Sequence, residues 1–287
     1  MQLSKILLPV DFSARSTAAA HYAKTLACRF HSELILAHVF ELTDLITSGG
    51  ETGVPPEWFE ERRMASRDML KEFCAEEFRN MPTRRMLLEG DVARSIVNLA
   101  HTEHTDLLVI PTHGYGGFRR FILGSVTAKI LHDADCPVLT GVHLEEAPPL
   151  DPIFFRKIVC AIDFDSAGEK ALRWAADFAA EFNAHLTVVH ALPSLDVGQA
   201  RYFDQALPMM LRQVAEERLG EFQTQAGTAA EVVLEPGTVA EVVQRAAVSQ
   251  NADLVVIGRH ENPGLLGRLR ANAYSVVRES PCPVVSV

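Results

Sequence analysis

The sequence predicts an α/β fold of two tandem, doubly wound domains, each an open five-stranded parallel sheet of order 3-2-1-4-5 with helices on both faces. The first observation that supports this prediction is an internal repeat. Residues 5–40 align without a gap on residues 157–192, at a constant offset of 152 residues. Strand-like and helix-like segments also alternate along each copy, which favours parallel strands joined by right-handed crossovers. Finally, the continuous apolar runs at residues 107–110 and 254–257 suit central strands buried on both faces.

The repeat divides the chain into a first domain at residues 1–143, a linker at 144–152 and a second domain at 153–287. Each half has about 140 residues, which is an ordinary domain size, and is long enough to bury its own core. The two copies act as controls for each other. A residue that the fold requires should persist in both copies, whereas a residue that a ligand requires can persist in one.

The first copy is expected to contain five strands and four helices. The strands are predicted in its apolar runs, at residues 5–10, 33–39, 83–89, 106–110 and 137–142. The helices are predicted between them, at residues 14–30, 58–79, 92–104 and 125–133. Pro55 and Pro56 precede the long charged helix, and Asp91 is well placed as the N-cap of the next one.

Loops at the carboxyl ends of the strands are the places to expect a ligand, because open parallel sheets bind ligands where the strand order reverses. These loops begin at residues 11–13, after residue 40 and at residues 111–123. The segment 41–57 is polar and rich in Gly and Pro, and it reads as a loop over the mouth of the first domain. Residues 193–208 are its counterpart in the second copy.

Composition and charge disfavour several classes of partner. The net charge of −10 and the pI near 5.6 argue against nucleic acid, which requires a basic surface. No stretch reaches the length of a membrane span, and the first residues lack the apolar core of a signal peptide. The five cysteines are scattered and form no CxxC pair, so we expect a reduced, cytoplasmic protein without nucleic-acid or membrane partners.

A glycine-containing pattern follows the fourth strand of the first copy. Pro111-Thr-His-Gly114 is followed by nine residues and then by Gly124 and Ser125, which open a helix. Glycine lets backbone N–H groups approach an anion closely, and a helix N-terminus adds unpaired N–H donors and a favourable dipole. The pattern therefore indicates a phosphate-binding corner.

This pattern is similar to the ATP-binding signature of the universal stress protein family, G-2x-G-9x-G-[ST]. Residues 9–13, the Ala37-His-Val39 end of the second strand and the passage at residues 90–110 also resemble that family, and the resemblance covers both halves. It implies that the base and ribose lie near the ends of strands 1 and 2, with the phosphates on the glycine loop. Carried over by position, the implied site comprises Pro9, Val10 and Asp11 at the nucleoside, Val39 at the adenine, Ile110, Pro111, His113 and Gly114 as a wall, and Gly124, Ser125 and Val126 at the phosphates.

The resemblance also implies the ligand and the partners. The ligand is an adenine nucleotide, ATP, with or without Mg²⁺. The two domains are expected to pair through their last strands within one chain, which leaves a homodimer of chains open, and a further protein partner remains unidentified. No catalytic or metal-binding residue is assigned.

Two departures from the signature bear on this interpretation. Pro111 replaces the first glycine and has no N–H to donate. In the second copy the matching residues are Gly258, Glu261 and, after nine residues, Ala271 and Asn272. A carboxylate beside a triphosphate costs on the order of a few kcal/mol, as much as a helix N-terminus contributes, at most about 2 kcal/mol. The second domain is therefore expected to bind nucleotide poorly or not at all.

Several polar residues can be interpreted either as functional or as structural. Asp11 and Asp163 are either ribose or metal contacts or N-caps of the following helix, with equal weight. His38 and His190 are expected to be structural. The spacing of His101 and His104 permits a metal in principle, but a third ligand is missing, which favours a solvated helix face.

Three functions compete. The sequence contains no P-loop lysine, no GxSxG elbow and no evident carboxylate pair, which favours holding ATP over cleaving it. The leading hypothesis is an ATP-binding stress-response sensor or switch with little or no hydrolysis. The alternatives are an interaction or scaffold module with a vestigial site, which Pro111 favours, and a nucleotide-using enzyme such as a slow ATPase or an adenylating enzyme.

Overall fold

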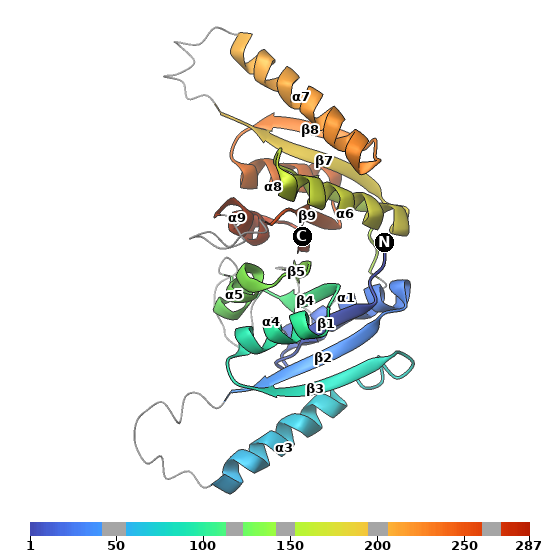
Figure 1. The fold of residues 1–287 in the computed structure, drawn as a ribbon, viewed down its shortest axis with the longest axis vertical. Helices are drawn as coiled ribbons and strands as arrows, with labels where there is room; N and C mark the ends of the chain where they lie inside the picture. The colour runs from blue at the N-terminus through green and yellow to red at the C-terminus, as the bar shows by residue number, and fades with distance from the viewer. Residues whose placement is uncertain (42–55, 113–122, 142–152, 195–205, 260–270) are drawn as a thin grey trace, which may run out of the picture. The chain divides into compact units, whose positions relative to one another are not determined.

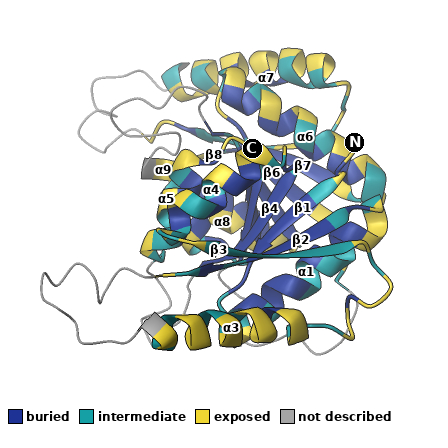
Figure 2. Ribbon diagram, turned by 60° about the horizontal axis from the view of Figure 1, so that its bottom comes forward, coloured by how far each residue is buried: buried dark blue, intermediate teal, exposed yellow. Residues whose placement is uncertain are grey.

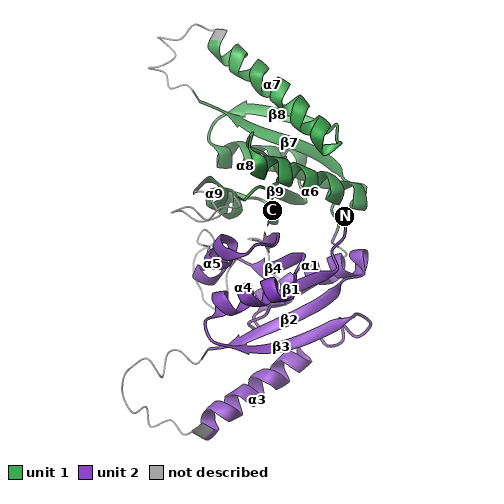
Figure 3. Cartoon of the chain, viewed as in Figure 1, with its two compact units in different colours: residues 1, 154–287 green, residues 2–153 purple. Residues whose placement is uncertain are grey.

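The computed structural model describes residues 1–41, 56–112, 123–141, 153–194, 206–259 and 271–287 (Figure 1). The chain divides into two compact units, which Figure 3 colours separately. Residues 2–153 form one of them, here called domain 1, and residues 154–287 together with Met1 form the other, domain 2. The predicted linker at 144–152 lies outside the described residues, as does most of the predicted loop at 41–57.

Domain 1 is a parallel sheet with helices on both faces. Its elements in chain order are β1 (Lys5–Pro9), α1 (Ala14–Phe30), β2 (Glu33–Phe40), α3 (Pro56–Glu72), β3 (Thr83–Glu89), α4 (Val92–Thr102), β4 (Leu107–Pro111), α5 (Ser125–Asp133) and β5 (Val138–Gly141). The strand order is β3-β2-β1-β4-β5, and the neighbouring strands are parallel.

Domain 2 repeats this architecture. Its elements are β6 (Lys157–Ala161), α6 (Ser166–Phe182), β7 (His185–Leu192), α7 (Ala206–Ala226), β8 (Glu231–Pro236), α8 (Val239–Gln250), β9 (Leu254–Ile257), α9 (Ala271–Glu279) and β10 (Val284–Ser286). The strand order β10-β9-β6-β7-β8 is the same order read from the other end, again with parallel neighbours. The predicted fold class is confirmed in both domains.

The cores lie where the apolar runs predicted them. Ile6, Leu7 and Leu8 of β1 and the runs in β4 and β9 are fully or almost fully buried. Figure 2 shows the central strands β1 and β4 largely in dark blue, with exposed residues on the helices around them. Helix α1 packs against the sheet with alanines at helical spacing, which allows a close approach. None of the helices in the described part of the chain is both long and apolar enough to cross a bilayer.

One pair of aspartates illustrates what the fold itself requires. The carboxylate of Asp106 accepts hydrogen bonds from the N–H groups of Ser4 and Lys5, at 2.7 and 2.9 Å. Asp253 accepts the same two bonds, at the same distances, from the N–H groups of Arg156 and Lys157. Each carboxylate ties the start of its central strand to the adjacent one, which explains why the residue persists in both copies.

The predicted helix at 58–79 is shorter than expected. Helix α3 ends at Glu72, and residues 73–80 form hydrogen-bonded turns in which Cys74 has a φ of 47°. A left-handed backbone at Cys74 cannot continue an α-helix. The charged composition of this stretch did not reveal the change.

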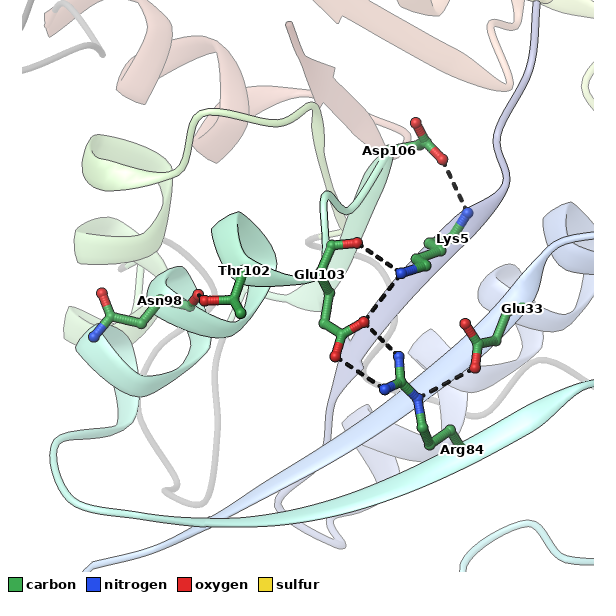
Figure 4. Close-up of polar contacts among 7 residues, drawn as sticks. All are labelled: Lys5, Glu33, Arg84, Asn98, Thr102, Glu103 and Asp106. Carbon is green, nitrogen blue, oxygen red and sulfur yellow. Dashed lines mark hydrogen bonds and ion pairs between the residues drawn. The ribbon is translucent and has the colours of Figure 1, made fainter.

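A partly exposed ion cluster lies at the amino ends of the strands in domain 1 (Figure 4). Both guanidinium Nη atoms of Arg84 donate to the carboxylate of Glu103, at 2.9 and 2.6 Å. The ammonium of Lys5 adds a bond of 3.1 Å, and Arg84 Nε also lies 3.2 Å from Glu33. The hydrogen bonds from Arg84 and Lys5 lower the pKa of Glu103 to about 2. The cluster holds three strands and the end of α4 together, at the end of the sheet opposite to the carboxyl ends of the strands.

Candidate functional site

The strand order of domain 1 reverses at β1, which pairs with β2 on one side and with β4 on the other. Pairing continues past the end of β1, because the N–H of Val10 donates to the carbonyl of Ala37 at 2.8 Å. The carboxyl ends of β1, β2 and β4 therefore lie at one edge of the sheet. This is the position where doubly wound folds bind ligands.

Asp11 lies in the loop between β1 and α1 and is held by two serines. Its Oδ1 atom accepts hydrogen bonds from Ser13 N at 3.0 Å, from Ser13 Oγ at 2.6 Å and from Ser16 Oγ. The N-cap of α1 is Ser13, whose hydroxyl accepts from the N–H of Ser16. The N-cap interpretation of Asp11 is therefore wrong, because the carboxylate braces the capping serine and does not itself cap the helix.

The second carboxylate oxygen of Asp11, Oδ2, differs from Oδ1 in its hydrogen bonding. Oδ2 is shielded from solvent and has no hydrogen-bond partner among the described residues. A buried carboxylate oxygen without a donor is costly, and such atoms usually have a missing ligand, water or ion as their explanation. Asp11 thus fits a ligand that brings a hydroxyl donor.

His38 supports the same loop from the end of β2. Its Nδ1 atom lies 2.7 Å from the carbonyl oxygen of Val10, and its ring packs on Phe12 at 4.3 Å. A carbonyl oxygen only accepts hydrogen bonds, so Nδ1 carries the proton. His190 makes the same contact in domain 2, at 2.9 Å from the Ile162 carbonyl. The contact is common to both domains, as expected for a structural histidine.

The start of α5 is attached directly to the end of β4. The N–H of Gly124 donates to the carbonyl of Thr112 at 2.9 Å, and the hydroxyl of the buried Thr127 donates to the carbonyl of Pro111 at 3.0 Å. Gly124 is the N-cap and supplies no side-chain cap, while Ser125 is exposed. The first N–H groups of an α-helix have no partner within it. The helix start therefore fits an anion.

The remaining predicted site residues divide into two groups. Pro9, Val39, Ile110 and Pro111 end the three strands that meet at this edge, and Val126 lies in the first turn of α5. His113 and Gly114 lie outside the described residues.

Domain 2 corrects one detail of the predicted correspondence. Helices α5 and α9 have nine residues each, and their buried pairs, Ile130 with Leu131 and Val276 with Val277, stand at the same positions. Ser125 therefore corresponds to Ala271, and not to Asn272 as the glycine spacing predicted. The loop before α9 is one residue shorter than the loop before α5. Counting nine residues on from Glu261 therefore reaches one residue too far. Position 270, opposite Gly124, and Glu261 both lie outside the described residues.

A cavity of about 70 Å³ lies at the carboxyl ends of the strands in domain 2. Among the residues that line it are the counterparts of Pro9, Val10, Asp11, Val39, Ile110 and Pro111, which are Ala161, Ile162, Asp163, Ala191, Ile257 and Gly258. The fold thus gathers these positions around one space in domain 2. The sequence gives no signal for the size or lining of this cavity, because domain 2 has lost the glycine pattern that indicates a nucleotide site.

The other histidines, cysteines and carboxylates in the described part of the chain form no metal site. Within the described ranges, no group of three or more His, Cys, Asp and Glu residues could hold a metal ion. His101 instead lies with its Nδ1 atom 2.7 Å from a carboxylate oxygen of Asp135. The five cysteines are free thiols, and burial raises the pKa of Cys160 and of Cys282, to about 12 for Cys282.

Two domains, each with five parallel strands in the order 3-2-1-4-5, define a tandem protein of the doubly wound α/β class. The sequence model of the universal stress protein family matches residues 3–140 and again residues 154–287. The chain belongs to this family and carries its domain twice.

Several relatives have the same description. A universal stress protein of Methanocaldococcus jannaschii is 31% identical over 137 residues, which cover 47% of this chain and 79% of that protein. One from Mycobacterium tuberculosis is 32% identical over 176 residues, 60% of this chain and 58% of that protein. One from Mycobacterium bovis is 25% identical over 291 residues, covering 98% and 95%.

The fold has a full-length match among solved structures. The crystal structure of a universal stress protein from Archaeoglobus fulgidus superposes with a TM-score of 0.74 at 22% identity, and the match covers 100% of this chain and 98% of that one. At this identity the likeness concerns the fold alone.

Proposed function

We propose that domain 1 binds ATP and that the chain acts as an ATP-binding sensor or switch in a stress response, with little or no hydrolysis. The observation that carries this proposal is the glycine-capped start of α5, tied to the end of β4 by two hydrogen bonds. These bonds preorganise N–H donors next to the strand-order reversal. Preorganised donors bind an anion without the cost of ordering a loop.

The nucleoside would lie beside the ends of β1 and β2. Pro9, Val10 and Val39 offer backbone and apolar surface there, and Asp11 offers its unpaired Oδ2 to a ribose hydroxyl. The phosphates would lie at the start of α5, formed by Gly124, Ser125 and Val126. The N–H groups of Ser125 and Val126 would be the donors there, because the N–H of Gly124 already donates to the carbonyl of Thr112. Ile110, Pro111, His113 and Gly114 complete the proposed set, with the last two outside the described residues.

The polar groups of this edge suit binding better than hydrolysis. The Oδ1 atom of Asp11 already accepts three hydrogen bonds, and the Nδ1 proton of His38 is committed to the Val10 carbonyl. Both side chains are thus fixed parts of the loop framework, and the sequence supplies no P-loop lysine and no evident carboxylate pair for hydrolysis. A nucleotide that is held without cleavage can report its own concentration, which is the property a sensor needs.

A second function has one specific observation in its favour. Pro111 stands where the signature has a glycine, so one backbone donor to the phosphates is missing. If this loss abolishes binding, the chain is an interaction module with a vestigial site. Nucleotide binding by the purified full chain separates the two functions.

The test begins with protein purified without added nucleotide. Denaturing it should release an adenine nucleotide, or calorimetry should detect ATP binding to the nucleotide-free chain. Gly124→Asp should abolish this binding by charge repulsion while keeping the helix, because Asp is a favourable N-cap. A wild-type chain that neither releases nor binds adenine nucleotide would overturn the proposal and leave the interaction module.

A further inference from the structure

The loop after the first strand has a different conformation in the two domains, and one helix position accounts for the difference. In domain 1 this position is Ser16, which is 1% exposed. Its Oγ atom accepts a hydrogen bond from the N–H of Asp11 at 3.0 Å and donates one to Asp11 Oδ1. Phe12, between the strand and the helix cap, has a φ of 63°, which is rare for a bulky residue.

In domain 2 the same position is Gly168. A Cβ atom on Gly168 would lie 1.9 Å from the carbonyl oxygen of Asp163. The backbone of the loop thus occupies space that a side chain fills in domain 1. Phe164, unlike Phe12, is not among the described residues with a positive φ. The presence or absence of a side chain at this position selects the loop conformation.

The two conformations leave the carboxylates in different environments. Asp163 is exposed. The counterparts of Ser13 and Ser16 in domain 2 are Asp165 and Gly168, which have no hydroxyl. Asp11, by contrast, has Oδ1 filled by three donors, so rotation of the carboxylate would break all three bonds. Only Oδ2 is left for a ligand, and its direction is fixed.

We propose that Ser16 is a positioning residue that aims Asp11 Oδ2 at a ribose hydroxyl, and that domain 1 thereby selects ribonucleotides over deoxyribonucleotides. This inference rests on the proposed function, the binding of ATP in domain 1. A hydroxyl that donates to a carboxylate makes a charge-assisted bond. A deoxyribose lacks that donor and leaves the buried acceptor unpaired, which a polar site penalises strongly.

The experiment compares ATP with 2′-deoxy-ATP and 3′-deoxy-ATP by calorimetry on the full chain. The wild type should bind ATP roughly tenfold or more tightly than at least one deoxy analogue. Ser16→Ala should weaken ATP binding and leave that analogue unchanged, so the preference falls towards one. Thr25→Ala is the matched control, because it removes a hydroxyl from the same helix whose bond goes to the carbonyl of His21. It should keep the wild-type preference.

Other outcomes overturn the inference in distinguishable ways. If Ser16→Ala weakens ATP and both analogues equally, or changes nothing, Ser16 has no positioning role, while ATP binding stands. If the wild type binds ATP and both analogues equally, the selectivity is absent and the proposed function survives. If it binds none of them, the proposed function fails first. Ser16→Cys, close in volume and a weak donor, serves as the second variant should Ser16→Ala not fold, and it should also reduce the preference.

Discussion

The hydroxyl of Thr127 donates a hydrogen bond to the main-chain carbonyl of Pro111, at 3.0 Å, and so joins the first turn of α5 to the last residue of β4. Domain 2 has Ala273 at the counterpart of Thr127 and cannot form this bond. The same proline that removes one donor from the glycine pattern thus provides the acceptor that holds the helix start. The missing N–H of Pro111 weakens the proposed phosphate site, whereas the hydrogen bond from Thr127 to its carbonyl supports that site.

Thr127→Val should therefore weaken ATP binding by roughly tenfold, because it removes the hydroxyl and leaves the Pro111 carbonyl with one donor fewer at nearly constant volume. Calorimetry on the full chain measures the effect. Thr102→Val is the control, since the hydroxyl of Thr102 bonds to Asn98 on the exposed side of α4, at 2.8 Å. Equal affinities for the wild type and Thr127→Val would show that the helix attachment has no part in binding.

Glu103→Gln should destabilise domain 1 by about 1 kcal/mol at neutral pH, because it removes the charge that Arg84 and Lys5 neutralise. Urea unfolding, followed through Trp58 in a Trp174→Phe background, reports domain 1. Glu76→Gln breaks an exposed ion pair with Arg79 and is the control, with an expected loss below about 0.5 kcal/mol.

The pH dependence of this effect has a definite sign. The folded-state pKa of Glu103 is about 2, below its ordinary value of 4.5. A depressed carboxylate pKa contributes stability above the ordinary pKa, and the contribution disappears as the pH falls through the folded-state value. The difference between the wild type and Glu103→Gln should therefore be constant above pH 5 or so and shrink towards zero near pH 2. A difference that grows below pH 4.5 would contradict this account.

Gly168→Ala should destabilise domain 2 by about 1–3 kcal/mol or more, because the new Cβ would lie 1.9 Å from a carbonyl oxygen of the neighbouring loop. Gly220→Ala, on α7 of the same domain, meets no atom within 4 Å and should stabilise its helix by up to about 1 kcal/mol. Fluorescence of Trp174, in a Trp58→Phe background, follows both transitions. Equal stabilities of the two variants would refute the steric role of Gly168.

The fold was predictable because two independent signals agree within each copy. The repeat identifies the domain, and features such as Asp106 and Asp253 persist because each ties a central strand to its neighbour. The alternation of apolar runs and amphipathic helices then determines the parallel order. The pairing of the two domains through their last strands stays a prediction.

Details of the site were less predictable, for physical reasons. Asp11 and Ser13 are both good N-caps, and only the backbone geometry shows that Ser13 has this role. The shift of one residue between α5 and α9 was missed because the nine-residue spacing of the signature was carried over to a domain whose loop is one residue shorter. The clamp on Asp11 depends on Ser16, a residue that sequence reasoning passed over because a serine in the first turn of a helix is ordinary.

The central claim is that the start of α5 holds the phosphates of one ATP, and that the start of α9 does not. Ser125 and Ala271 open these two helices at equivalent positions, and an Asp in a first helical turn is compatible with the helix dipole. Calorimetric titration with ATP of the wild type, Ser125→Asp and Ala271→Asp compares them directly. The account predicts one ATP per chain for the wild type and for Ala271→Asp, and none for Ser125→Asp. Binding that survives in Ser125→Asp but disappears in Ala271→Asp would contradict it.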